Sequence, residues 1–210
     1  DRKCPAKRGL HVLGALIKAH DENQFLIPPL PNTQFTRDTT AWIFGGVTLN
    51  PMRWPARQHE TVLASAIYNH HPAFATRDFE FWYGCAEGNH GMSTLEGGDI
   101  MPIGNGAVLI GMGERSSWQA ITQVARSLFA HHAARKVVVA AMAPDRASMH
   151  LDTVFSFCDT DLVTLYKPVV DTITSLVLEP STQEACFSVR VDDRHFTAVV
   201  ADCLGLDGLR

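Results

Sequence analysis

Residues 99–110 read DIMPIGNGAVLI, and this stretch decides the fold that the sequence predicts. An aspartate opens an apolar run, Asn105-Gly106 follows, and a second apolar run comes at Val108-Leu109-Ile110. Asn-Gly between two apolar runs is a strong hairpin signal, because both residues tolerate the positive φ of a tight turn. We therefore expect two antiparallel strands with an aspartate at the mouth of the first.

The same order occurs at two other places and makes a weak internal repeat. Asp38 and Asp152 each start an apolar strand, and the turn residues Gly45 and Asp159 come seven residues later. Second strands are expected at residues 47–49 and 162–165. In the first two copies a helix follows, from about residue 56 to 69 and after Ser116. A closing strand is then expected at residues 79–83 and 136–140. The unit is ββαβ, present two or three times, and it implies a quasi-symmetric ring on whose axis the carboxylates converge.

Both repeat helices are expected to bury an apolar stripe. Pro55 lies near the start of the first, and Ser116 with Gln119 is a possible capping box for the second. The stripe residues are Val62, Leu63, Ala66 and Ile67 in the first helix, and Ile121, Val124, Ala125, Leu128 and Phe129 in the second. A short helix is also expected at residues 195–204. Six aromatic residues are expected in the core: Trp42, Phe44, Trp54, Phe81, Trp82 and Trp118.

Composition narrows the class of protein. The chain has 210 residues, 46% of them hydrophobic, a mean hydropathy of −0.01 and a net charge of −4. The sequence contains no block of basic residues that would indicate binding to nucleic acid. It also contains no apolar run long enough to span a membrane. The five cysteines are scattered without a CxxC motif, which favours reduced thiols and a cytoplasmic protein. Cys158 is expected to be a small core residue.

The ionisable residues near the strand mouths indicate the chemistry. His150 and Asp152 stand two residues apart in an expected strand, where alternation would put both on one face. A histidine beside a carboxylate is a candidate acid/base group. Carboxylates such as Asp38 could bind a planar cation bidentately, and Arg57 and Arg115 could hold an anion on the same substrate. Any one of these residues alone is better explained as a cap, turn residue or surface ion pair, but the joint set at repeat positions favours a site.

Metal and dinucleotide sites are not indicated. The chain has no HExxH and no CxxC…H spacing, and its adjacent histidine pairs stand at expected helix ends, where a cation suits the helix dipole. The glycines at Gly104-Asn105-Gly106 and Gly111-Met112-Gly113 do not form a GxGxxG motif that opens a helix.

Several long ordered motifs resemble those of bacterial arginine deiminases, which are pentein-fold guanidino hydrolases. The resemblance runs from Phe25 onward. Its motifs are LPNTQFTRD at residues 30–38, GVTLNPM at 46–52, WPAR at 54–57, TLEGGD at 94–99, GMGERSS at 111–117 and MHLDTVF at 149–155.

The resemblance implies the fold and the activity. The fold would be α/β, a five-bladed pentein propeller of ββαβ units, of which about three blades are covered. Residues 1–24, with a stripe of Leu10, Leu13, Leu16 and Ile17, would end a helical insertion. Residues 25–210 would be a partial catalytic domain. The family hydrolyses L-arginine to L-citrulline and ammonia without a cofactor, and the complete protein is expected to be a homo-oligomer.

The resemblance also implies roles for single residues. Asp38 and Asp152 would grip the guanidinium, Glu96 would support them, and His150 would be the general acid/base. The remaining members of the set would bind substrate, with no metal involved: Asn32, Arg57 and Arg115 at the amino-acid end, and Phe35 and Asp99 beside them.

The sequence departs from the family at the nucleophile. The family uses a cysteine in a Met-Ser/Thr-Cys-Pro motif, and none of the five cysteines here stands in that context. Roughly the middle half of the family's chain is present. Three hypotheses stay open: an arginine deiminase or a piece of one, a guanidino-binding homologue without turnover, and a fragment that neither folds nor binds.

Overall fold

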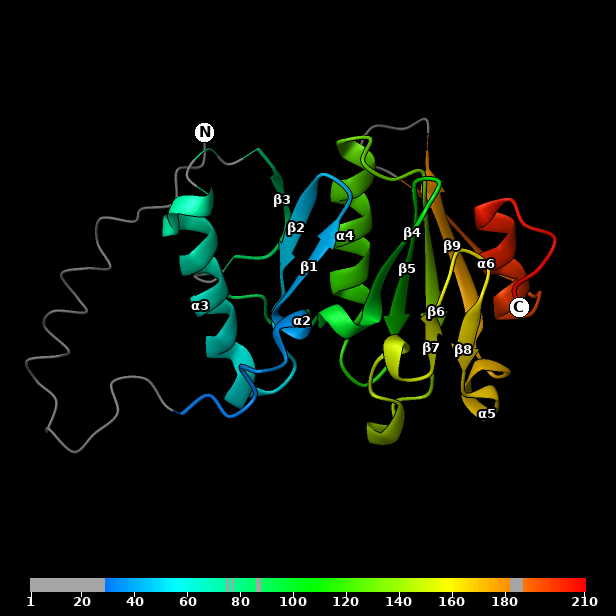
Figure 1. Ribbon diagram of the computed structural model, residues 1–210, viewed down its shortest axis with the longest axis horizontal. Coiled ribbons are helices and arrows are strands. Elements are labelled where there is room, and N and C mark those ends of the chain that lie inside the picture. Colours follow the sequence, from blue (N-terminus) through cyan, green and yellow to red (C-terminus); the bar gives the residue numbers. More distant parts are fainter. Residues whose placement is uncertain (1–28, 75, 77, 86–87, 182–186) are drawn as a thin grey trace, which may run out of the picture. The chain divides into compact units, whose positions relative to one another are not determined.

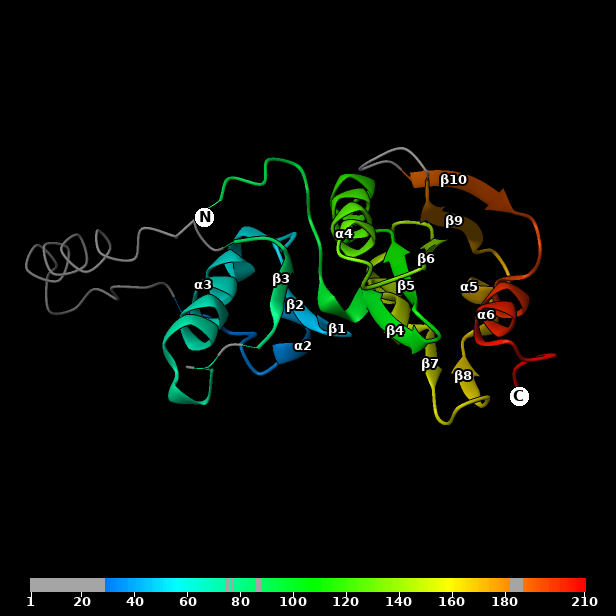
Figure 2. The same ribbon diagram turned by 90° about the horizontal axis from the view of Figure 1, so that it is seen from above.

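The computed structural model describes residues 29–210 except 75, 77, 86–87 and 182–186. The chain divides between Asn32 and Thr33 into two units. The second unit, residues 33–210, contains all the elements described below (Figures 1 and 2). The helix predicted within residues 1–24 lies outside the described residues, so that prediction stays open.

The first ββαβ unit forms where the sequence predicts it. Strands β1 (Thr40–Ile43) and β2 (Gly46–Leu49) pair antiparallel, helix α3 (Pro55–His70) follows, and β3 (Glu80–Tyr83) pairs parallel with β2. The short turn η1 (Pro72–Phe74) lies between α3 and β3. These strands make a three-stranded sheet in the order β1-β2-β3.

The second ββαβ unit is larger. Strands β4 (Ile100–Gly104) and β5 (Ala107–Met112) form the predicted hairpin, and Asn105 and Gly106 have φ values of 47° and 66° at its turn. Helix α4 (Trp118–Ala130) and strand β6 (Lys136–Ala141), parallel to β5, complete the unit. Strands β9 (Thr174–Pro180) and β10 (Phe187–Asp192) extend the sheet to the order β10-β9-β6-β5-β4.

Strands β5 and β6 of the five-stranded sheet are buried on both faces, as their unbroken apolar runs require. Successive residues alternate between two core clusters: Val108 and Val137 pack with α4, and Leu109 and Val138 pack with α6 (Phe196–Leu204). The two helices lie on opposite sides of the sheet (Figure 1). The predicted stripe of α4 is fully buried, and the predicted helix near residues 195–204 is confirmed.

The third repeat stops after its hairpin. Strands β7 (Phe155–Phe157) and β8 (Val163–Leu165) form a separate two-stranded sheet. The helix that follows, α5 (Lys167–Val170), has four residues, and the next strand, β9, pairs antiparallel with β6. The mixed α/β class is confirmed. Because the described strands fall into three sheets, the closed propeller stays a prediction.

Three predictions about burial are wrong. The stripe of α3 faces outward, with Val62, Leu63 and Ile67 between 41% and 52% exposed. Polar residues near the start of the helix turn inward instead, because they belong to an ion-pair network described below. Cys158 is exposed, since β7 ends at Phe157. Of the expected core aromatics, Trp42, Phe44 and Trp54 are exposed. Within the described residues, no helix has the length and apolarity needed to cross a membrane.

Candidate active site

Three short helical turns place the repeat aspartates. Asp38 lies in α2 (Thr36–Thr39), Asp99 in η2 (Gly97–Asp99) and Asp152 in η4 (Leu151–Thr153), each just before its hairpin. A fourth turn, η3 (Arg146–Ser148), precedes η4. The turns meet, so all three carboxylates lie close enough to His150 to interact with it electrostatically. The predicted convergence of the carboxylates is therefore confirmed.

His150 and Asp152 do not lie in a strand. His150 is the N-cap of η4, and the strand begins only at Phe155. Strand alternation therefore cannot explain why the two side chains are neighbours. They are neighbours because both flank Gly98: a Cβ on this glycine would lie 2.7 Å from His150 Nδ1 and 3.1 Å from Asp152 Oδ1. The absence of a side chain at residue 98 makes room for the pair.

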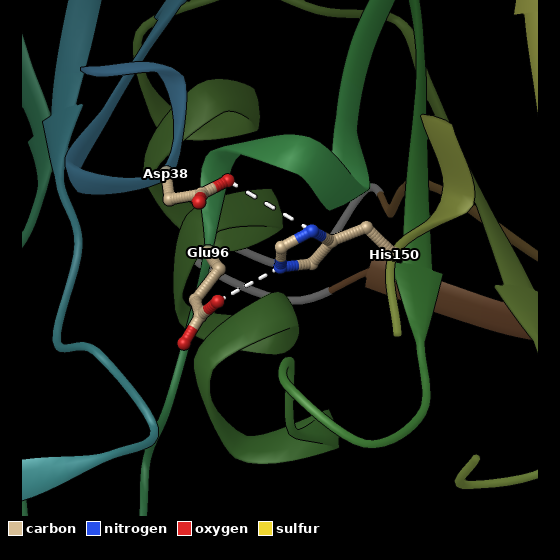
Figure 3. Close-up of side chains that lie close together, drawn as sticks. All are labelled: Asp38, Glu96 and His150. Carbon is tan, nitrogen blue, oxygen red and sulfur yellow. Dashed lines mark hydrogen bonds and ion pairs between the residues drawn. The ribbon is translucent and has the colours of Figure 1, made fainter. Parts of the chain in front are cut away.

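The His150 imidazole is held between two carboxylates (Figure 3). Its Nε2 lies 2.8 Å from Glu96 Oε2, and its Nδ1 lies 3.8 Å from Asp38 Oδ1. All three residues are buried. Burial alone would lower the pKa of His150, but the hydrogen bond to Glu96 and the charges of Asp99, Asp38 and Glu96 outweigh it and raise the pKa. The arrangement therefore favours the protonated imidazolium.

Glu96 is the centre of the network. Its Oε2 faces His150 and also accepts a hydrogen bond from Arg115 Nη1 at 2.9 Å. Its Oε1 accepts a hydrogen bond from the backbone N–H of Arg53 at 3.1 Å. Burial would raise the pKa of Glu96, but the hydrogen bond to His150 and the charge of Arg115 prevail and lower it. Arg115 also contacts the Glu114 carboxylate.

Arg57 joins α3 to the same network. Its Nη1 donates to Asp38 Oδ2 at 2.7 Å, and its Nε and Nη2 donate to the two oxygens of Glu60 at 3.0 and 2.9 Å. Burial would lower the pKa of Arg57, but the hydrogen bonds to Glu60 and Asp38 raise it. Residues 57, 60 and 61 are the buried part of α3: these ion pairs hold Arg57 and Glu60 inward, and the Thr61 hydroxyl donates to the carbonyl of Asn50 at 2.7 Å.

Asp99 is engaged entirely within the protein. Its side chain has no exposed surface, Oδ1 accepts from the backbone N–H of Leu151 at 2.9 Å, and Oδ2 accepts from Ser116 Oγ at 2.5 Å. Burial raises the pKa of Asp99 to about 7 despite the opposing charge of His150 and these hydrogen bonds. Asp99 thereby fixes the backbone next to His150.

Ser116 is not the cap of α4. The N-cap is Ser117, whose hydroxyl accepts from the N–H of Ala120, so the predicted capping box with Gln119 is wrong. Ser116 is drawn into the site instead, where its hydroxyl also accepts from the N–H of Glu96 at 3.1 Å. This single side chain connects Asp99 to Glu96.

The other predicted residues lie nearer the surface. The Asp152 carboxylate is 28% exposed, 3.5 Å from Arg37 Nε, and burial raises its pKa against the charges of His150 and Arg37. Phe35 is exposed, and its carbonyl accepts from Arg57 Nη2 at 3.4 Å. Asn32 belongs to the first unit, so its role stays a prediction. A cavity of about 460 Å³ beside β4 and β7 is lined by Arg37 and Asp152, among others.

Asp38, Glu96 and His150 could also hold a metal ion, since their ligand atoms lie within 4.8 Å of one another. The charges around them fit such an ion poorly. Arg115 and Arg57 already approach Glu96 Oε2 at 2.9 and 3.9 Å, and a divalent cation would be repelled by both.

Sequence reasoning missed Glu60, Ser116 and Gly98. Glu60 stands three residues after Arg57 on the predicted helix, so the spacing of a helical ion pair could have revealed it. The other two carried no such signal, because their roles depend on contacts with residues distant in the sequence.

Fold and site together define a mixed α/β protein, with a buried histidine and carboxylates at the mouths of repeated hairpins. The chain belongs to the arginine deiminase family, whose model matches residues 5–210.

Two solved structures with TM-scores above 0.5 share the fold. The product-bound N-terminal domain of ArgZ, an arginine dihydrolase of Cyanobacteria, is 21% identical with a TM-score of 0.51, covering 79% of this chain and 56% of its own. An alanine variant of AgrE in complex with L-arginine is 19% identical with a TM-score of 0.51. The match covers 78% of this chain and 23% of the AgrE chain. A dimethylarginine dimethylaminohydrolase adduct is 17% identical with a TM-score of 0.47. The match covers 76% of this chain and 60% of the dimethylaminohydrolase chain. The chain thus spans 60% or less of each of these relatives.

Proposed function

We propose that this chain supplies the guanidinium-binding and acid/base groups of an arginine deiminase, which hydrolyses L-arginine to L-citrulline and ammonia. One observation carries the proposal: His150 is held between Glu96 and Asp38, with Asp152 at the exposed edge of the same cluster. A buried imidazole surrounded by carboxylates is suited to receive a cation and to hold a proton for the leaving group.

Asp38 and Asp152 would bind the two edges of the guanidinium. Asp38 already accepts a guanidinium N–H, that of Arg57, at 2.7 Å, so its geometry suits this donor. The raised pKa of Asp152 is caused first by burial. A bound guanidinium would lower that pKa again, because an opposite charge favours the carboxylate form.

The reaction would proceed in two steps. A cysteine thiolate attacks the guanidinium carbon and forms a carbon–sulfur bond, and His150 gives its proton to the departing nitrogen, which leaves as ammonia. His150 then takes a proton from water, whose oxygen attacks the same carbon. The carbon–sulfur bond breaks with its electron pair on sulfur, which restores the thiolate, and the second water proton goes to solvent as citrulline forms. Glu96 stabilises the imidazolium that both steps require.

The amino-acid end of the substrate would meet Arg57 and Arg115. Each is 5% exposed and already paired with acids, Arg57 with Asp38 and Glu60, and Arg115 with Glu96 and Glu114. A substrate carboxylate would share these two guanidinium groups. Phe35 and Asn32 would complete that end, and Asp99 would act through Leu151 and Ser116.

A second candidate is guanidino binding without turnover. It is favoured by the cluster around His150, which contains no cysteine among the described residues. Of the described cysteines, Cys203 lies on the buried face of α6, and Cys85 and Cys158 are exposed elsewhere.

Calorimetry and a citrulline assay on the 210-residue chain test both candidates. We expect L-arginine to bind, and Asp152→Asn to weaken binding by about tenfold or more, because a charge-assisted hydrogen bond to a partly buried carboxylate is lost. Asp193→Asn removes an exposed charge outside the site and should leave binding unchanged. We expect no citrulline from this chain. Absence of binding, or equal effects of the two substitutions, would contradict guanidinium binding, and citrulline above background would reject the second candidate.

A further inference from the structure

Behind the candidate active site, buried residues form a closed ring of hydrogen bonds that links His150 to Glu96 twice. The direct link runs from His150 Nε2 to Glu96 Oε2 at 2.8 Å. The second link begins with Leu151, which follows His150 and whose backbone N–H donates to Asp99 Oδ1 at 2.9 Å. It ends at the Ser116 hydroxyl, which contacts Asp99 Oδ2 and accepts from the backbone N–H of Glu96. We call this the Ser116 hydrogen-bond ring. Each of its five residues is at most 6% exposed, so the ring is shielded from solvent.

Ser116 joins the two halves of this ring. Its oxygen accepts from the N–H of Glu96 at 3.1 Å and lies 2.5 Å from Asp99 Oδ2. While Asp99 is ionised, the Ser116 hydroxyl donates to it, and once Asp99 is protonated, the carboxyl can donate to Ser116 instead. The contact therefore persists in both protonation states of Asp99. Alanine in place of Ser116 would leave the Glu96 N–H and Asp99 Oδ2 buried without this partner, which is a costly arrangement.

A glycine fixes the Asp99 carboxyl from behind. Gly111 is buried in β5, which pairs with β4 on one side and with β6 on the other. A Cβ built on Gly111 would overlap Asp99 Oδ1 and approach the Cβ of Leu151 to 3.0 Å, so no side chain fits there. Because a central strand is held at both edges by ladder hydrogen bonds, the carboxyl has no room to move toward β5. A displaced Asp99 would therefore shift Leu151 and, with it, His150.

We propose that Ser116 is a positioning residue, which fixes how closely the His150 imidazole approaches Glu96. The latter two residues are the N-caps of η4 and η2, three-residue turns from different repeats, and neither turn has a side-chain cap hydrogen bond. Such short turns hold their own geometry weakly, so a second link is needed to keep the imidazole against the carboxylate. The role in catalysis rests on the proposed function, in which His150 gives up and regains a proton while it stays bound to Glu96.

Two adjacent serines provide the first test in the 210-residue chain. Ser116→Ala opens the ring, whereas Ser117→Ala removes the N-cap of α4 and leaves the ring intact. An NMR titration of the histidine side chains measures the pKa of His150, whose signal is the one missing in His150→Gln. We expect Ser116→Ala to lower this pKa, because a Glu96 carboxylate that turns away supports the imidazolium less. Ser117→Ala should lower the melting temperature without changing the pKa of His150.

The same spectra separate the geometry of the contact from the charge of Asp99. Loss of the Ser116 contact also favours neutral Asp99, which would by itself lower the pKa of His150. At about pH 5, well below the pKa of about 7 for Asp99, this carboxyl is neutral in every variant. The chemical shift of the Nε2 proton then reports the contact with Glu96 alone. We expect this signal to move upfield in Ser116→Ala, because the hydrogen bond lengthens, and to stay in place in Ser117→Ala.

Two glycines provide the second test, from the opposite side of Asp99. Gly111→Ala places a methyl group against the carboxyl, whereas the atoms nearest a Cβ on Gly113 lie 3.8 Å away, at ordinary contact distance. We expect Gly111→Ala to change the pKa of His150 and the shift of its Nε2 proton as Ser116→Ala does. Gly113→Ala should leave both unchanged.

The proposal is overturned if His150 behaves alike in both members of each pair. Where neither Ser116→Ala nor Gly111→Ala folds, amide hydrogen exchange in the unchanged chain decides. The N–H groups of Glu96 and Leu151 should exchange as slowly as those inside β5, and fast exchange at either would reject the ring. These measurements use no arginine, so a failure of the calorimetric test would reject guanidinium binding, while the titration would still decide the positioning of His150.

Discussion

At the scale of single residues, the buried carboxyl of Asp99 gives the protein a pH dependence. Burial raises the pKa of Asp99 from 3.8 to about 7. A carboxyl whose pKa is higher in the folded than in the unfolded state stabilises the fold in its protonated form. Its contribution is fully present below the unfolded pKa and is lost as the pH rises toward the folded pKa.

We therefore expect the free energy of unfolding to fall between about pH 4 and pH 7, and Asp99→Asn to lose less of it over this interval. Urea denaturation at a series of pH values measures this difference. Asp193→Asn, at an exposed position, should show the same pH dependence of the free energy of unfolding as the unchanged protein. Parallel curves for Asp99→Asn and the unchanged protein would show that Asp99 does not titrate in this window.

A second residue-scale prediction concerns the pairing of His150 with Glu96. The hydrogen bond to Glu96 is the largest contribution that raises the pKa of His150. Glu96→Gln should lower this pKa, because the substitution removes a negative charge and leaves Arg115 and Arg57 close by. An NMR titration of the histidine rings measures it. Glu179→Gln, in the exposed pair with Lys136, should not change it. A His150 pKa that stays the same in Glu96→Gln would contradict the assigned contact.

At the scale of elements, strands with unbroken apolar runs were predictable and the faces of α3 were not. Strands β5 and β6 and helix α4 follow their sequence patterns because burial on the five-stranded sheet dominates their energetics. Helix α3 reverses its pattern, since Arg57 pairs with both Asp38 and Glu60 and a polar face of the helix turns inward. Likewise, no local signal separates Ser116 from Ser117, because only the distant Asp99 draws Ser116 away from the helix cap. The periodicity of apolar residues therefore predicts how elements pack, but it does not predict ion pairs and hydrogen bonds between residues distant in the sequence.

The reversed helix leads to an element-scale prediction. Glu60→Gln should destabilise the protein by about 1–3 kcal/mol, because the buried Arg57 loses a charged, two-point partner. Val62→Ser, on the outer face of the same helix, should change stability by about 0.5 kcal/mol or less. Thermal and urea denaturation compare the two. A larger loss from Val62→Ser would mean that the apolar face of α3 is the buried one.

At the scale of the whole molecule, the second unit exposes two kinds of associating surface. The outer face of α3 presents Val62, Leu63 and Ile67 to solvent, and a contiguous apolar patch of this kind favours association. Strand β10 is one of the two edge strands of the five-stranded sheet, and its Val189 and Val191 are 46% and 55% exposed. An uncovered edge strand can pair with another chain. Each surface could produce the self-association expected of this family, by packing or by strand pairing.

We expect the chain to self-associate through the outer face of α3, because three of its apolar side chains share one helical surface whereas β10 exposes two. The paired substitution Leu63→Lys and Ile67→Lys should shift the chain toward monomer, because charged groups would have to lose their hydration in the contact. Size-exclusion chromatography with light scattering over a range of concentrations measures this. The paired substitution Val189→Lys and Val191→Lys is the matched control, with equal added charge on the edge strand. Association that persists in the α3 variant and disappears in the β10 variant would assign it to strand pairing instead, and a monomer in the unchanged chain would show that neither surface associates.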